Sequence, residues 1–291
     1  MSLPELFHHE TLFVGVLGIR RMARLRKLQA SDTNRSLPAG EGGLERLAEA
    51  LLFSLEGAMD PGYDFALNTQ ALDYDSLGKC PALADDQRCS IHENRKPSVC
   101  SMVPFDALYP NRMQDSVLLS RQLGEECIVA GYREGYDVIF ENSRITDAEY
   151  KKAIEKRRQD LIMDKEVWGK EVFSMFGPEL FKHPLHRERI PFDGYLSIPL
   201  TPVLMVLASY SEHTRSRCAQ YIRCQITLID KKIGQALERK NNQDKPITKE
   251  LRGIRAAYTQ LYPMLLQDNF TTPTVNSRNN PTVSTADYLG I

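Results

Sequence analysis

Hydrophobic residues recur at helical spacing in two stretches near the start of the chain. Between residues 12 and 28, arginines lie between apolar residues whose positions fit one face of a helix, which predicts an amphipathic helix with the apolar positions Phe13, Val16, Leu17, Met22, Leu25 and Leu28. A second run, from Leu44 to Ala58, has leucines at helical spacing and stops at Asp60, Pro61 and Gly62. The sequence therefore predicts two N-terminal helices joined by a loop.

A longer helix is predicted after residue 145. Thr146 and Glu149 have the spacing of a capping box, in which the Thr side chain accepts from a backbone N–H and the Glu side chain reaches back. The apolar face of this helix consists of Tyr150, Ile154, Leu161, Trp168 and Val172. Gly177 and Pro178 end it, and a proline-rich connection follows over residues 178–200.

Two further long helices are predicted toward the end of the chain. Thr201 and Pro202 open the first, with Thr as the cap and Pro at the first helical position, and it runs to the polar residues 240–244. The second runs from Thr248 to about Leu266. Residues 269–291 have the composition of a disordered tail.

Residues 63 to 140 show little periodicity of either kind. Short apolar pieces at 115–119 and 136–140 predict the strands of a small hairpin. The predicted fold is mainly α, with a loop-rich cysteine-containing segment and a short β-hairpin. We divide the chain into an N-terminal part at 1–145, a helical part at 146–268 and the tail at 269–291.

Composition and charge narrow the functional classes. The 291 residues are 42% hydrophobic and carry a formal net charge of -1, which argues against non-specific nucleic-acid binding by the protein as a whole. The apolar run at 12–19 is too short to span a membrane, and the basic residues follow it, whereas a secretory signal places them first. We therefore expect a cytoplasmic protein with no membrane anchor.

Four of the six cysteines fall in the irregular segment, where thiols carry the strongest chemical signal in the chain. Cys80, Cys89, Cys100 and Cys127 are spaced C-x8-C-x10-C-x26-C, with turn-forming residues between them, so we expect the thiols to lie on loops. In a reducing compartment, clustered cysteines more often bind metal than form disulfides. We predict that these four thiols hold one metal centre.

The spacing does not choose the metal. Zinc takes four tetrahedral ligands and a [4Fe–4S] cluster takes one cysteine per iron, so four thiolates suit both. The absence of a C-x2-C pair weakens the zinc-ribbon version and mildly favours a cluster. The cationic neighbours Lys79, Arg88, Arg95, Lys96 and Arg112 favour the thiolate form that ligation needs.

The same segment carries a motif. The stretch from Cys80, followed by Pro, through Cys89, followed by Ser-Ile-His-Glu, to Cys100 and Phe105 resembles the signature of the YkgJ-type cysteine-cluster family, described as zinc- or iron-chelating proteins. The resemblance implies that Cys80, Cys89 and Cys100 are ligands and matches Cys127 to the late cysteine of the family. In this chain His92 replaces the usual Tyr, one residue is added before Pro97, and the early cysteines of the family are missing.

Three functional classes stay open on these grounds. The first is a metal- or cluster-binding protein whose helical half contacts a protein partner. The second is an enzyme, because flagellin lysine N-methylases are similar to this family in carrying a cysteine cluster. The third is a helical interaction module that binds nucleic acid through the basic face from Arg20 to Lys27.

The remaining candidates favour a structural interpretation. Cys218 and Cys224 are six residues apart, about 240° around a helix, so their thiols do not converge and we expect core or surface thiols. His92 is expected to be a structural histidine, and Pro184 and the loop setting argue against His183 and His186 as a helical metal pair. No phosphate-binding or nucleophile-elbow motif is present, so no catalytic residue is assigned.

Overall fold

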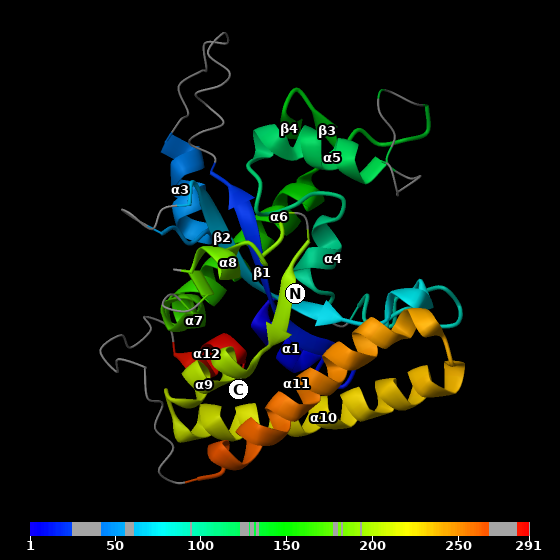
Figure 1. Cartoon of the computed structure of the whole chain (residues 1–291). Coiled ribbons are helices and arrows are strands. Elements are labelled where there is room, and N and C mark those ends of the chain that lie inside the picture. The colour runs from blue at the N-terminus through cyan, green and yellow to red at the C-terminus, as the bar shows by residue number, and fades with distance from the viewer. Residues whose placement is uncertain are drawn as a thin grey trace.

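A computed structural model shows that a small antiparallel sheet joins distant parts of a mainly helical chain (Figure 1). The structure describes residues 1–24, 42–55, 61–93, 95–122, 128, 131, 134–176, 180–181, 183–192, 194–267 and 284–290. Strand β1 (Val14–Ala23) lies between β2 (Tyr63–Leu72) and β5 (Leu196–Pro199), with both neighbours antiparallel to it. The prediction of a mainly α fold with few strands is confirmed.

The predicted helix at 12–28 is wrong, because its described part is strand β1. Leu17 pairs with Thr69 of β2 and with Ile198 of β5, so β1 is hydrogen-bonded on both edges. Its residues from Val14 to Ile19 are buried on both faces, and a strand buried on both faces has no period-two alternation to distinguish it from a helix. Leu25 and Leu28, which completed the predicted apolar face, lie outside the described residues.

The other N-terminal elements are short. Helix α1 (Leu3–His8) precedes β1, and Ser2 and Glu5 form a capping box at its start. Helix α3 (Gly42–Leu51) is shorter than the predicted helix at 44–58, because Phe53 leaves the helix and pairs with Phe65 of β2. Between β2 and residue 122 lie η2 (Asp75–Leu77), α4 (Ser98–Met102), η3 (Asn111–Met113) and α5 (Gln114–Gln122).

The hairpin exists, but at a different place from the predicted one. Residues 115–119 belong to helix α5, and the strands are β3 (Phe140–Glu141) and β4 (Arg144–Ile145). The two turn residues Asn142 and Ser143 have φ of 49° and 58°. Two left-handed residues are what a two-residue turn needs to match the twist of the flanking strands.

The helix predicted after residue 145 begins one residue later than expected, because its cap is Asp147 and not Thr146. Asp147 caps α6 (Ala148–Asp164) by accepting from the Tyr150 N–H, while the Thr146 hydroxyl donates to the Val138 carbonyl. The π-helical turn η4 (Lys165–Gly169) connects α6 to α7 (Lys170–Phe176). The predicted apolar face is confirmed, since Ile154, Leu161, Trp168 and Val172 are buried.

The predicted helix from Thr201 is two helices. After α8 (Pro184–Arg187) and β5, α9 (Thr201–Ala208) begins with Leu200, not Thr201, in the cap position. The chain turns at residues 209–211, and the Ser211 side chain accepts from the Thr214 N–H to cap α10 (Glu212–Arg239). After η6 (Asn242–Asp244), α11 (Lys245–Leu265) packs antiparallel to α10 in Figure 1.

The predicted disordered tail is wrong for residues 285–289, which form helix α12 (Thr285–Leu289). Its Leu289 is buried, and α12 contacts α1 and α10. Residues 268–283, which make up most of that tail, lie outside the described residues.

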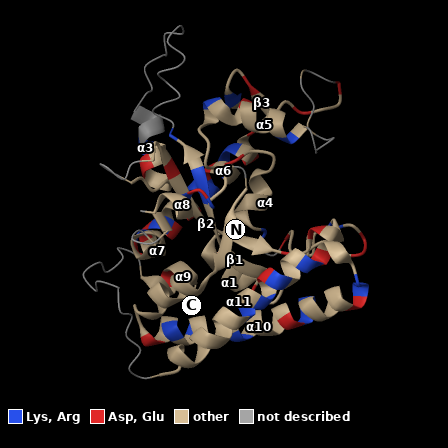
Figure 2. Cartoon of the chain, in the orientation of Figure 1, with Lys and Arg blue, Asp and Glu red and all other residues tan. Residues whose placement is uncertain are grey.

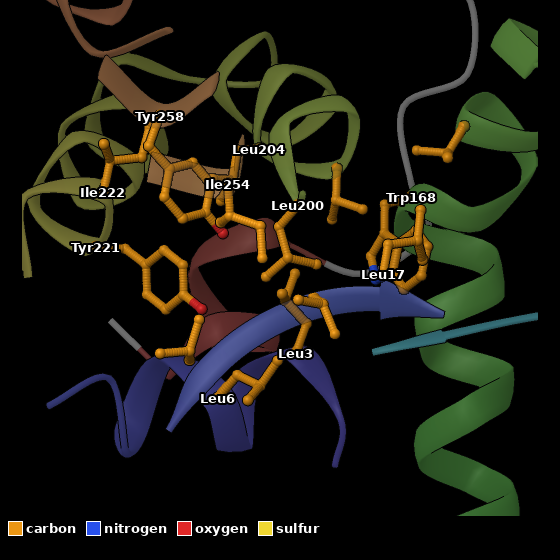
Figure 3. Close-up of a cluster of buried hydrophobic side chains, with 14 of the residues drawn as sticks. Leu3, Leu6, Leu17, Trp168, Leu200, Leu204, Tyr221, Ile222, Ile254 and Tyr258 are labelled. Atoms are coloured by element: carbon orange, nitrogen blue, oxygen red, sulfur yellow. The ribbon is translucent and has the colours of Figure 1, made fainter. Parts of the chain in front are cut away.

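The main hydrophobic core lies between the sheet and helices α1, α9, α10 and α11 (Figure 3). Figure 3 shows Leu3 and Leu6 of α1 on one side of β1 and Tyr258 of α11 and Leu200 on the other. A second core, which includes Met22, Ala66, Phe105 and Ile154, joins the sheet to α4 and α6. Both predicted parts of the chain, 1–145 and 146–268, contribute to each core; the proposed division itself stays a prediction.

Candidate metal centre

Three of the four predicted ligands lie in the segment between β2 and α5. Cys80 opens a tight turn, in which its carbonyl accepts from the Leu83 N–H at 2.9 Å and its Sγ accepts from the Ala82 N–H at 3.4 Å. Cys89 pairs with Leu83 in an isolated antiparallel bridge, so the two cysteines belong to one compact loop. The prediction that these thiols lie on loops is confirmed for Cys80 and Cys89 and is wrong for Cys100, which lies on helix α4.

Cys100 lies on the short helix α4, which is fastened to the N-terminal helix. The Glu5 carboxylate accepts from the Ser98 N–H at 2.6 Å and from the Ser2 N–H at 2.7 Å. Burial alone would raise the pKa of Glu5, but these two backbone N–H donors lower it overall. Glu5 is thus an ionised cap that fixes the position of Cys100.

The fold brings Cys80 and Cys100 into one electrostatic environment. Burial raises the pKa of the Cys100 thiol, and Cys80 raises it further, whereas the Met1 amine and Lys96 lower it. The net direction is upward, so the Cys100 thiol is protonated at neutral pH and must lose that proton to become a ligand. Of the cationic residues noted in the sequence, Lys96 contributes to this environment.

The predicted ligand thiols in the described residues are more accessible to solvent than the Cys218 thiol. Cys80 and Cys100 are exposed and Cys89 is partly buried against the main core. Cys218 is fully buried in that core, and burial raises its pKa to about 12, which confirms that it is a core thiol. Cys224 is partly exposed on α10.

The ligand set is brought together only in part. Within the described ranges, no three His, Cys, Asp or Glu side chains are gathered closely enough to hold a metal ion. Cys127, the fourth predicted ligand, lies outside the described residues. The described residues therefore include three of the four predicted ligands, with Cys80 and Cys89 in one loop and Cys100 on helix α4.

The histidines noted in the sequence have other surroundings. His92 is exposed and its backbone N–H donates to the Cys89 carbonyl at 3.2 Å, which helps to close the cysteine loop. The rings of His183 and His186 lie 4.6 Å apart on either side of the start of α8.

The basic residues near the start of the chain are used within the fold. The Arg20 guanidinium donates to Tyr109 Oη at 3.1 Å and to the Phe192 carbonyl at 3.1 Å. Arg21 lies over the Phe192 ring at 4.0 Å, and Arg24 pairs with Asp64 at 3.2 Å. These arginines belong to strand β1 and the residue after it, so the basic helical face predicted for nucleic-acid binding does not exist in the described chain.

Charges elsewhere are mixed in sign. Figure 2 shows Lys and Arg interspersed with Asp and Glu along α10 and α11.

Among the described helices, none combines the length and the apolar character needed to cross a membrane.

Sequence reasoning also missed a polar cavity bounded by α1, α10, α12 and Arg95. Its residues come from four distant parts of the chain, from Pro4 to Gly290, so nothing in the local sequence points to it.

The chain was compared with known families, with curated proteins and with solved structures, and none of the three comparisons found a match. The resemblance to the cysteine-cluster family therefore rests on its motif residues alone.

Proposed function

We propose that this chain is a metal-binding cysteine-cluster protein in which Cys80, Cys89, Cys100 and Cys127 hold one zinc ion or one [4Fe–4S] cluster. The observation that carries the proposal is the compact loop that holds Cys80 and Cys89, in which the Cys80 carbonyl accepts from the Leu83 N–H at 2.9 Å and Leu83 pairs with Cys89. The influence of Cys80 on the pKa of Cys100 agrees with this, although 20 residues separate the two thiols. The exposed thiols Cys80, in this loop, and Cys100, on helix α4, would supply two ligands, and Cys89 of the same loop as Cys80 would supply a third.

The architecture of the segment supports coupling between metal binding and loop order. The part of the segment around residues 106–109 is already anchored, because Arg158 donates to the Tyr109 carbonyl at 2.9 Å and Gln114 donates to the Asp106 carbonyl at 2.7 Å. Cys80 and Cys89, by contrast, lie in a loop held mainly by its own turns. Metal binding in such a loop would contribute on the order of 10 kcal/mol of coupled binding and folding energy if the ion is zinc.

The two metals would serve different purposes. Zinc in a four-thiolate site acts as a structural cross-link, whereas a [4Fe–4S] cluster supplies electron-transfer chemistry. In either case the protein has to deprotonate Cys100 and offset the charge of the thiolates, and Lys96 is placed to assist with both.

The first experiment is purification without oxygen, followed by an absorption spectrum and by metal and sulfide analysis. Brown protein with iron and acid-labile sulfide would support the cluster, and colourless protein with one zinc per chain would support the structural site. Protein that contains neither metal and does not bind either one on reconstitution would contradict the proposal.

A pair of cysteine variants makes the test specific. Cys100→Ser is expected to abolish stoichiometric metal binding and lower the melting temperature of the metal-loaded protein. Cys224→Ser, on α10, is the matched control and should retain the metal. Full metal content and an unchanged melting curve in Cys100→Ser would show that the ligands are assigned incorrectly.

The alternatives receive no specific support. The arginines on which nucleic-acid binding depended have intramolecular partners. A methyl-transfer activity stays an analogy through the cysteine motif, and the helical half stays our predicted surface for a protein partner.

A further inference from the structure

A cavity of about 390 Å³ lies where α1, α10 and α12 meet the loop that carries Arg95. Cavities of this size are typical of sites for small molecules. Its walls combine apolar side chains with charged and imidazole groups, and the lining residues that matter here are Phe7, His8, Glu10, Arg95, Asp287 and Leu289. None of the described cysteines lines the cavity, so a proposal about it does not rest on the proposed metal centre.

Most of the charges around the cavity are already paired. Glu10 accepts from Arg217 Nη1 at 2.7 Å, and Arg217 also donates to the Phe7 carbonyl at 2.9 Å. Glu5 accepts from two backbone N–H groups at the start of α1 and α4. Neither the Glu10–Arg217 pair nor Glu5 is therefore available to a ligand without losing an existing bond.

The two histidines hold Arg95 in place, and His8 adds no positive charge. His9 Nε2 and the Arg95 carbonyl are 3.0 Å apart, so His9 donates from this nitrogen. His8 Nδ1 lies 3.2 Å from Arg95 Nη1 and accepts from it, which requires a neutral imidazole. Burial, His9 and Arg95 lower the pKa of His8, in agreement with that neutral form.

One cationic and one anionic side chain lining the cavity have no partner of opposite charge among the described residues. The Arg95 guanidinium has His8 as its side-chain partner and no carboxylate within ion-pair distance among the described residues. The Asp287 side chain, on α12, has no hydrogen-bond or ion-pair partner among them either. The Arg95 backbone is held at φ 55°, a left-handed conformation that a non-glycine residue adopts at a cost.

We propose that this cavity binds a free α-amino acid, with its carboxylate on Arg95 and its ammonium on Asp287. A guanidinium matches a carboxylate through two parallel hydrogen bonds, and Asp287 supplies the opposite charge for the amine. Phe7 and Leu289 offer apolar surface to the amino-acid side chain. A simple anion would leave Asp287 unmatched, and a simple cation would leave Arg95 unmatched.

The probes are L-leucine, leucinamide and 4-methylpentanoate, tested on the full chain by isothermal titration calorimetry. Leucinamide lacks the carboxylate and 4-methylpentanoate lacks the amine, while both keep the side chain. L-leucine is expected to bind about tenfold or more tightly than either analogue, because each analogue leaves one protein charge without its partner. A panel of the other amino acids then establishes which side chain is preferred.

Two charge-removing variants assign the contacts. Arg95→Gln should weaken L-leucine binding and abolish the advantage of L-leucine over leucinamide. Asp287→Asn should abolish its advantage over 4-methylpentanoate. Arg252→Gln and Glu238→Gln, at exposed positions on α11 and α10, are the matched controls and should bind as the unmodified chain does.

The proposal is overturned if no amino acid of the panel binds at millimolar concentrations to the folded chain. It is also overturned if Arg95→Gln and Asp287→Asn bind L-leucine as tightly as the unmodified protein. Because Arg95 and Asp287 are both exposed, these variants are expected to fold, and their circular dichroism spectra verify this.

Discussion

At the scale of single residues, Gly15 shows how closely β1 is packed against the helices. A Cβ at this position would lie 2.2 Å from Tyr221 Oη and 2.9 Å from Leu200 Cδ1. The strand has little freedom to move away, because the Gly15 N–H donates to Gln225 at 2.9 Å and its carbonyl accepts from Tyr258 at 3.2 Å. Only a residue without a side chain fits between these groups.

Gly15→Ala is therefore expected to destabilise the protein by about 1–3 kcal/mol through overpacking. Gly234→Ala is the matched control, because a Cβ there meets nothing within 4 Å and lies inside helix α10. That control should be neutral or stabilising by about 0.5–1 kcal/mol, since Ala favours the helix over Gly. Urea unfolding of the two variants measures both changes; an equal loss of stability in both would contradict the packing argument.

Asp164 predicts a pH dependence of stability. Its carboxyl is buried, and burial raises its pKa to about 6 although Tyr288 donates to it and Arg157 lies near it. Because the pKa is raised above its unfolded value, this contribution to stability is complete below pH of about 4 and is lost as the pH rises through about 6.

The loss amounts to about 3 kcal/mol at most and can be isolated by subtraction. Asp164→Asn removes it. The Met1 amine, whose pKa burial lowers to about 5, contributes the opposite slope in both proteins. Because the Asp164 charge raises the pKa of that amine, its removal strengthens the opposite slope and changes the difference in the same direction. The difference in unfolding free energy between Asp164→Asn and the unmodified chain should therefore change with pH from 4 to 7. A constant difference would mean that Asp164 does not titrate in this range.

At the scale of elements, the hydrophobic pattern predicted the helices that have an apolar face but did not predict the three-stranded sheet. Ile154, Leu161 and Trp168 recur at the spacing of one helical face, and all three are buried. In β2, by contrast, Asp64, Asn68 and Thr69 are buried polar residues that interrupt the pattern of a strand. Which polar residues a sheet will bury depends on contacts from distant elements, so local patterning could not show it.

The turns that hold Cys80 and Cys89, by contrast, could be predicted from the local sequence. The chemistry of the cysteine segment depends on residue type and turn residues, both of which are visible locally, and Cys80 and Cys89 are found in turns as expected. The influence of Cys80 on the pKa of Cys100 and the cap supplied by Glu5 depend on tertiary packing. The cavity at Arg95 and Asp287 was beyond sequence reasoning because it joins parts of the chain that are far apart.

Helix α12 is expected to depend on one hydroxyl group. Tyr288 Oη accepts from Trp168 Nε1 at 3.1 Å and donates to the buried Asp164 carboxyl. Tyr288→Phe leaves both partners without this bond and should weaken the docking of α12 by about 1–3 kcal/mol. Hydrogen exchange at residues 285–289 measures the effect, with Tyr262→Phe on α11 as the control; unchanged protection in Tyr288→Phe would show that apolar contacts alone hold α12.

At the scale of the whole molecule, the predicted N-terminal and helical parts are joined by the sheet and by both cores. Strand β5 comes from the helical part and pairs with β1 over four residue pairs, from Val16 with Pro199 to Ile19 with Leu196. Arg158 of α6 also donates to the carbonyl groups of Ala107 and Tyr109, which ties the two parts together through polar contacts.

Unfolding should therefore be a single cooperative transition, despite the contrast between a loop-rich part and a helical part. Trp168, the single tryptophan, is buried in the main core and reports on the helical part by its fluorescence. Cys89 is partly buried in the N-terminal part, so its labelling by a thiol reagent, measured in a variant that keeps Cys89 as its one cysteine, reports on the other. The two probes should give the same urea midpoint, because β1 pairs with β5 of the helical part and with β2 of the N-terminal part. Two separate midpoints would instead mean that the β1–β5 pairing contributes little to stability, and that the two parts unfold as independent units.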